Sequence, residues 1–90
     1  MTRPGSAQIE AALRAALEPT ALQVQDDSHL HAGHAGAREG GHFTVHIESA
    51  RFNGLSRVAR HRLVYHAVAP LMQAGIHALA IDARAPQDKP

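Results

Sequence analysis

The sequence contains no cysteine and no tryptophan, and it has only one tyrosine and two phenylalanines among its 90 residues. Without thiols the chain forms no disulfide, and it cannot hold a structural zinc ion or an iron–sulfur cluster through cysteines of its own. The shortage of aromatic residues removes the stacking platforms that bind single-stranded nucleic acids. Any sulfur ligand of a metal centre must therefore come from a second molecule.

Long hydrophobic runs and a strong net charge are also missing. No segment approaches the roughly 20 apolar residues of a membrane span, and residues 1–8 contain no apolar stretch of the signal-peptide type. The formal net charge is +1 with histidine neutral, so bulk charge does not drive binding to nucleic acids. We expect one cytoplasmic domain over residues 1–90, not inserted in a membrane and with flexible ends at 1–5 and 85–90.

Histidine is abundant, with 8 residues in the chain. His29, His31 and His34 lie in residues 28–41, a glycine-rich segment without an apolar period that is expected to be a mobile loop. Imidazole is the commonest protein metal ligand, and it titrates near neutral pH. The loop alone is a weak metal signal, and a solvated polar loop explains it better. A simple metal-binding or pH-responsive scaffold remains an open alternative.

Two segments have apolar residues at helical spacing. The first covers residues 6–17, with Ser6 as its expected N-cap. The second follows Ser56, and we expect Pro70 to kink or end that helix and Gly75 to cap it. Its core-facing stripe is predicted to be Val58, His61, Val64, Tyr65, Val68, Leu71 and Met72.

Three segments alternate apolar and polar residues, which predicts strands at 21–27, 42–49 and 76–83. The order helix–strand–strand–helix–strand then predicts an α/β (α+β) fold with one three-stranded mixed sheet. The first two strands would pair antiparallel, and a right-handed crossover would place the third parallel to the second. Both helices would cover the same face of the sheet.

Two histidines outside the loop stand out. His77 begins the third predicted strand, on the parity that faces the helices together with Leu79 and Ile81. It is either a ligand that the loop can approach at the end of the sheet or a partly buried histidine that donates to a carbonyl. His61 lies in the apolar stripe of the second helix, which favours a core histidine hydrogen-bonded to the backbone.

Basic residues cluster around the start of the second predicted helix: Arg51, Arg57, Arg60 and Arg62. Together with the helix N-terminus they could contact phosphate, although a solvated basic face is the favoured interpretation. The serines 28, 49 and 56 fall at expected turns or caps, and the sequence has no phosphate-binding glycine loop. We therefore expect no enzymatic activity.

Longer segments of the sequence resemble the BolA family. They are RFNGLSRVARHRLVYHAV (residues 51–68) and GIHALAIDAR (75–84), with DDSHLHAGHAG and HFTVHIES before them. The resemblance extends from Ile9 to Arg84. It implies a fold like a class II KH domain and partnership with a monothiol, CGFS-type glutaredoxin. In that complex a bridging 2Fe–2S cluster is held on one side by the glutaredoxin cysteine and a glutathione thiol.

The same resemblance implies which residues of this chain hold iron. The histidine before Ala-Leu is a ligand, which is His77 here, and the variable-loop ligand maps best to His31, with His34 as its competitor. No cofactor is expected in the isolated chain, which would be a monomer or a weak homodimer. Family members are also described as transcription regulators, so DNA binding through Arg57, Arg60 and Arg62 is the alternative function.

Overall fold

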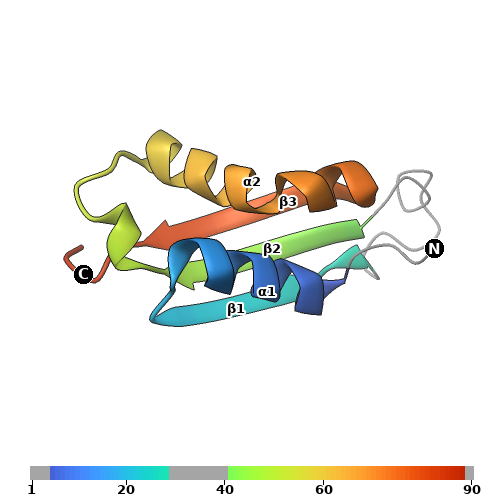
Figure 1. Ribbon diagram of the computed structural model, residues 1–90, viewed down its shortest axis with the longest axis horizontal. Helices are drawn as coiled ribbons and strands as arrows, with labels where there is room; N and C mark the ends of the chain where they lie inside the picture. The colour runs from blue at the N-terminus through green and yellow to red at the C-terminus, as the bar shows by residue number, and fades with distance from the viewer. Residues whose placement is uncertain (1–4, 29–40, 89–90) are drawn as a thin grey trace.

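The computed structural model describes residues 5–28 and 41–88. These residues form two helices and three strands in the predicted order (Figure 1), and each strand boundary lies within one residue of its predicted position. The elements are α1 (Ser6–Leu17), β1 (Ala21–Asp26), β2 (Gly41–Glu48), α2 (Arg57–Ala74) and β3 (Ile76–Arg84), with a short 3-10 helix (Ala50–Phe52) between β2 and α2.

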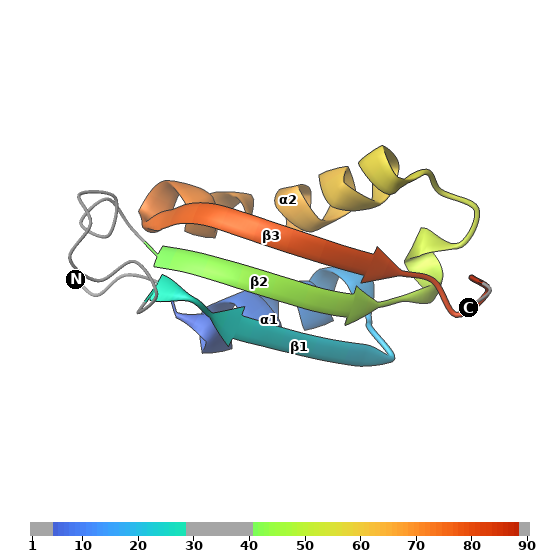
Figure 2. The same ribbon diagram turned by 180° about the vertical axis from the view of Figure 1, so that it is seen from behind.

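The three strands form one mixed sheet in the order β1-β2-β3. β1 pairs antiparallel with β2, from Ala21 opposite Glu48 to Asp26 opposite Phe43, and β2 runs parallel to β3. Both helices lie on the same face of this sheet (Figure 1). Figure 2 shows the opposite face, which neither described helix covers and which we call the open face. The predicted fold is confirmed.

The core lies between the two helices and the sheet. Its main buried apolar side chains are Ile9, Leu13, Leu17, Phe43, Val45, Ile47, Phe52, Val64, Val68, Ile76 and Leu79. The spacing of four residues along α1 and α2 and of two along β2 places each set on one side of its element. Leu22 and Val24 of the edge strand β1 are only partly buried against this cluster.

The buried stripe of α2 is narrower than predicted. Val64 and Val68 are fully buried, whereas Val58 is 60% exposed and Tyr65 is 41% exposed. Tyr65 lies beside β3, where its hydroxyl donates a hydrogen bond to the Leu79 carbonyl at 3.2 Å. The prediction is therefore wrong for Val58 and Tyr65, because α2 contacts the sheet along a narrow row rather than along the whole apolar arc.

The N-caps of the two helices differ in how well the sequence predicts them. Gly5, not Ser6, is the N-cap of α1, and its N–H donates to the side-chain oxygen of Gln8 at 2.8 Å. The Gln8 side chain thus accepts the hydrogen bond from the N–H of the N-cap residue, and the Ser6 hydroxyl is not needed for capping. Ser56 caps α2 as predicted, since its Oγ accepts from the Ala59 N–H at 3.2 Å.

Pro70 lies inside α2 without ending it, because the helix continues to Ala74. Of the two expected effects of Pro70, ending the helix is wrong, whereas a kink stays a prediction, since proline removes one N–H from the helical ladder. Gly75 caps the helix as predicted, with a φ of 149° and an N–H that donates to the Leu71 carbonyl. Neither described helix is long and apolar enough to span a lipid bilayer.

The connection from β2 to α2 is anchored to the end of α1. Ser49 is fully buried, and its Oγ donates to the Leu17 carbonyl at 2.6 Å and accepts from the Arg51 N–H at 3.1 Å. Phe52, three residues later, is also fully buried in the core. These two residues fix where the chain leaves the sheet and hence where α2 begins.

Candidate functional site

The predicted metal ligands divide between described and undescribed parts of the chain. His31 and His34, like His29, lie outside the described residues, so their prediction as ligands stays a prediction. His77 is described, and it is an exposed residue near the start of β3. The site is therefore built from His77 outward.

A β-bulge decides where the His77 side chain points. Gly41 is opposite Ile76 but His42 is opposite Ala78, so β3 has one extra residue at this point. Ile76 and Leu79 are buried in the core, and the two residues between them are exposed. A bulge re-aims side chains in this way. The prediction that His77 faces the helices is therefore wrong, because strict alternation does not hold across the bulge.

The bulge brings His77 next to a second imidazole. The rings of His42 and His77 have centroids 5.0 Å apart and are tilted by 51°. His42 is a half-buried residue on the polar side of β2, opposite the side of Phe43 and Val45. Sequence reasoning did not find this pair, because 35 residues separate the two histidines and the bulge sets their relative positions. The one available signal was a histidine near the start of each of two neighbouring strands.

Gly41, next to His42, leaves space that the Phe43 ring occupies. A Cβ at this position would lie 2.5 Å from Cε2 of the Phe43 ring. Because Phe43 is buried in the core, its ring cannot move away easily. A glycine is therefore needed where β2 begins and where the register with β3 shifts.

The end of β1 is fastened to β2 beside His42. The Asp27 N–H donates to the His42 carbonyl at 2.8 Å, and the His42 N–H donates to Oγ of Ser28 at 3.0 Å. Thr44 donates to the Asp27 carboxylate at 2.5 Å. A hollow of about 310 Å³ next to these contacts is lined by Asp27, His42, Phe43, Thr44, Ala78, Leu79 and Ala80. Ser28, the first residue of the predicted loop, thus lies beside His42.

The potential metal ligands at this site are too few to surround a metal ion by themselves, and they suit a metal centre that a second molecule helps to bind. Within residues 5–28 and 41–88, no group of three or more histidine, aspartate or glutamate side chains could hold a metal ion. The chain has no cysteine. The exposed imidazole of His77, with the half-buried ring of His42 beside it, fits a group whose remaining ligands come from another segment or another protein.

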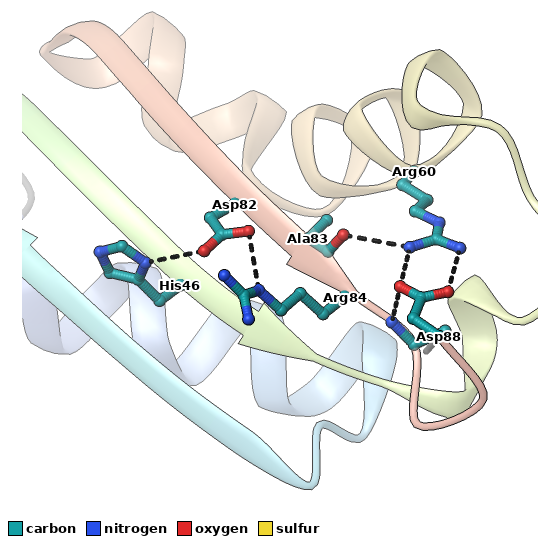
Figure 3. Close-up of polar contacts among 7 residues, drawn as sticks. His46, Arg60, Asp82, Ala83, Arg84 and Asp88 are labelled. Carbon is teal, nitrogen blue, oxygen red and sulfur yellow. Dashed lines mark hydrogen bonds and ion pairs between the residues drawn. The ribbon is translucent and has the colours of Figure 1, made fainter. Parts of the chain in front are cut away.

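The predicted phosphate-contacting arginines have different environments. Arg60 Nη1 and Nη2 bind the Asp88 carboxylate at 2.6 and 2.9 Å, and Nη1 also donates to the Ala83 carbonyl (Figure 3). Nε of the same guanidinium donates to the Leu55 carbonyl. Arg60 therefore fastens α2 to the end of β3, which removes it from the candidate nucleic-acid surface. Arg57 and Arg62 are exposed.

Two further histidines have positions that the structure clarifies. His61 is only half-buried, and it lines a cleft with Arg57 and Ile81 rather than lying in the core as predicted. His46 lies on the open face, 3.3 Å from the Asp82 carboxylate, which also binds Arg84 (Figure 3). The Arg84 hydrogen bond, followed by that of His46, lowers the pKa of Asp82.

Replacing Asp88 with asparagine should destabilise the fold in a pH-dependent way. The Arg60 hydrogen bonds, and then the Ala85 N–H, lower the pKa of Asp88 from 3.8 to about 2. Because the folded-state pKa is the lower one, ionised Asp88 stabilises the fold above about pH 4, and this contribution is lost between about pH 4 and 2. Urea unfolding should show Asp88→Asn below wild type at pH 6, with the difference vanishing near pH 2.

The exposed neighbour Gln87 supplies the control for this measurement, since Gln87→Ala should follow the wild-type curve throughout. A stability difference between Asp88→Asn and wild type that stays constant from pH 6 to pH 2 would contradict the assignment.

Comparisons with known proteins give concordant matches. Residues 13–88 match a family model described as BolA-like protein. The chain is 43% identical over 82 residues to "Protein BOLA1, chloroplastic" of Arabidopsis thaliana, which covers 87% of this chain and 51% of that protein. It is 40% identical over 74 residues to "DNA-binding transcriptional regulator BolA" of Escherichia coli K12, covering 82% of this chain and 69% of that one.

A solved structure agrees with these sequence matches. The structure of BolA1 from Arabidopsis thaliana has a TM-score of 0.82 at 38% identity, and the match covers 100% of both chains. This chain spans about half, 51%, of the length of the chloroplastic Arabidopsis thaliana relative.

Proposed function

Because this chain belongs to the BolA-like family, we propose that it is a non-enzymatic iron–sulfur adaptor. It would bind a monothiol, CGFS-type glutaredoxin and co-ligate a bridging 2Fe–2S cluster for cluster trafficking or for iron and redox regulation. The observation that carries the proposal is His77, which a bulge exposes on the open face of a cysteine-free chain, beside a second imidazole.

Each partner has a distinct part in the proposed complex. His77 and one loop histidine, His31 or His34, would supply nitrogen ligands from this chain. The glutaredoxin cysteine and a glutathione thiol would supply the sulfur that this chain lacks. Replacing thiolates by imidazoles raises the reduction potential of a cluster, which suits transfer or sensing. A cytoplasmic location is part of the proposal, although one relative is named chloroplastic.

Reconstitution tests this function directly. The chain is mixed with a CGFS glutaredoxin, glutathione, ferrous iron and sulfide, and visible circular dichroism is recorded. We expect a spectrum that differs from that of the glutaredoxin homodimer with its own cluster, together with a heterodimer on a sizing column. A spectrum equal to that of glutaredoxin alone, with no heterodimer, would refute the adaptor function.

A second candidate function is DNA binding, which one relative's name supports. The Escherichia coli relative is named a DNA-binding transcriptional regulator, and Arg57 and Arg62 of this chain are exposed at the start of α2. Arginines at a helix N-terminus are suited to contact phosphates. Regulation would then depend on a basic surface separate from the His42–His77 pair.

Removing this basic surface should weaken duplex binding. In Arg57→Gln/Arg62→Gln, the affinity for duplex DNA should fall, and the slope of log affinity against log salt should decrease by about 2, about 1 for each lost phosphate contact. Fluorescence anisotropy at several salt concentrations measures both quantities. Arg14→Gln, an exposed arginine on α1, is the matched control. No binding of the wild type at low salt would exclude this candidate.

A further inference from the structure

We propose that His42 is a positioning residue that holds the His77 imidazole in the orientation needed to bind iron. This inference rests on the adaptor function proposed above and deepens it. It concerns a residue on the polar side of β2. The ring centroids of His42 and His77 lie 5.0 Å apart, close enough for each ring to limit the rotation of the other.

His42 has the fixed environment that a positioning residue requires. It lies on β2, the central strand of the sheet, and its backbone carbonyl and N–H bind Asp27 and Ser28 of the neighbouring segment at 2.8 and 3.0 Å. Its side chain is half-buried, and its Nε2 atom is fully covered. The backbone of His42 is therefore fixed by hydrogen bonds, and neighbouring atoms cover the far end of its ring.

His77 has a much less constrained environment. It is the extra residue of the bulge and is exposed to solvent. An exposed side chain samples several rotamers, and binding a ligand must select one of them. A fixed neighbouring ring removes some of these rotamers in advance. Residues that orient a metal-ligating histidine typically change metal affinity by about 10–100-fold.

Three variants separate positioning from other roles of His42. His42→Ala removes the ring, His42→Phe keeps an aromatic ring but removes both nitrogens, and His46→Ala is the control. His46 lies on the same side of β2, four residues further on, and pairs with Asp82 instead of His77. Thermal unfolding of all variants establishes that the fold is retained.

The first measurement needs only the isolated chain. Three-bond NMR couplings to Cγ of His77 report its χ1 rotamers. We expect one dominant rotamer in wild type, His46→Ala and His42→Phe, and averaged couplings in His42→Ala. Averaged couplings already present in wild type, or unchanged couplings in His42→Ala, would overturn the inference.

The second measurement uses the complete complex with glutaredoxin, glutathione, iron and sulfide. We expect His42→Ala to weaken assembly of the cluster-bridged heterodimer about tenfold or more, and His42→Phe to restore most of this loss. If His42→Phe is as weak as His42→Ala, the nitrogens of His42 matter and positioning by the ring is refuted. If wild type forms no complex, the adaptor function fails, while the rotamer measurement still decides the role of His42.

Discussion

Replacing His77 with alanine is expected to abolish the cluster-bridged complex with a CGFS glutaredoxin. His77 is the described histidine that is both exposed and implied as a ligand by the family, and no group of three metal-binding side chains exists elsewhere in residues 5–28 and 41–88. Removing even a residue that supports a ligand costs about 10–100-fold in affinity, so loss of the ligand itself should cost at least about 100-fold. Visible circular dichroism of the reconstituted mixture measures this loss.

The control for this experiment is His66→Ala, which removes an exposed histidine of α2 and should leave the spectrum unchanged. The fold of His77→Ala should also stay intact, since the His77 side chain contributes nothing to the buried core. Identical spectra for His77→Ala and wild type would remove His77 from the ligand set, and the adaptor proposal would lose the observation that carries it.

Replacing Phe52 with alanine should have the largest effect on stability. Phe52 is fully buried and is the largest such side chain in the described part of the chain. Truncating a buried phenylalanine costs about 3–5 kcal/mol. A domain of this size has a free energy of unfolding of roughly 5–13 kcal/mol. Urea unfolding followed by far-ultraviolet circular dichroism should therefore show a much lower midpoint, or a chain already partly unfolded in buffer.

Val58 supplies the comparison, because it is 60% exposed on the adjoining helix. Val58→Ala should change the free energy of unfolding by no more than about 0.5 kcal/mol. Similar midpoints for Phe52→Ala and Val58→Ala would contradict the structural role of Phe52. Residues 51–54 (Arg-Phe-Asn-Gly) contain the buried Phe52 and a glycine, Gly54, with a φ of 77°. Both features indicate that this segment has a structural role.

The sequence alone identified some residues of the candidate site but assigned them a wrong orientation or a wrong role. Alternation in residues 76–83 located the third strand correctly, but it assigned His77 to the wrong face because a bulge lies between Ile76 and Ala78. The sequence indicated Arg60 as a candidate phosphate contact, yet its guanidinium is hydrogen-bonded to the carboxylate of Asp88, 28 residues away. Both errors arise from contacts between distant segments, which local patterns do not contain.

The sequence by itself determined the order of the elements, the mixed sheet with helices on one face, and the absence of any cysteine that could serve as a ligand. Hydrophobic periods and the absence of cysteine are local or compositional properties, so they can be read without a structure. Only the tertiary structure decided that His77 shares the open face with His42. Their contact depends on how β2 and β3 pair, and on an extra residue of β3 beside Gly41, where the Phe43 ring leaves no room for a side chain.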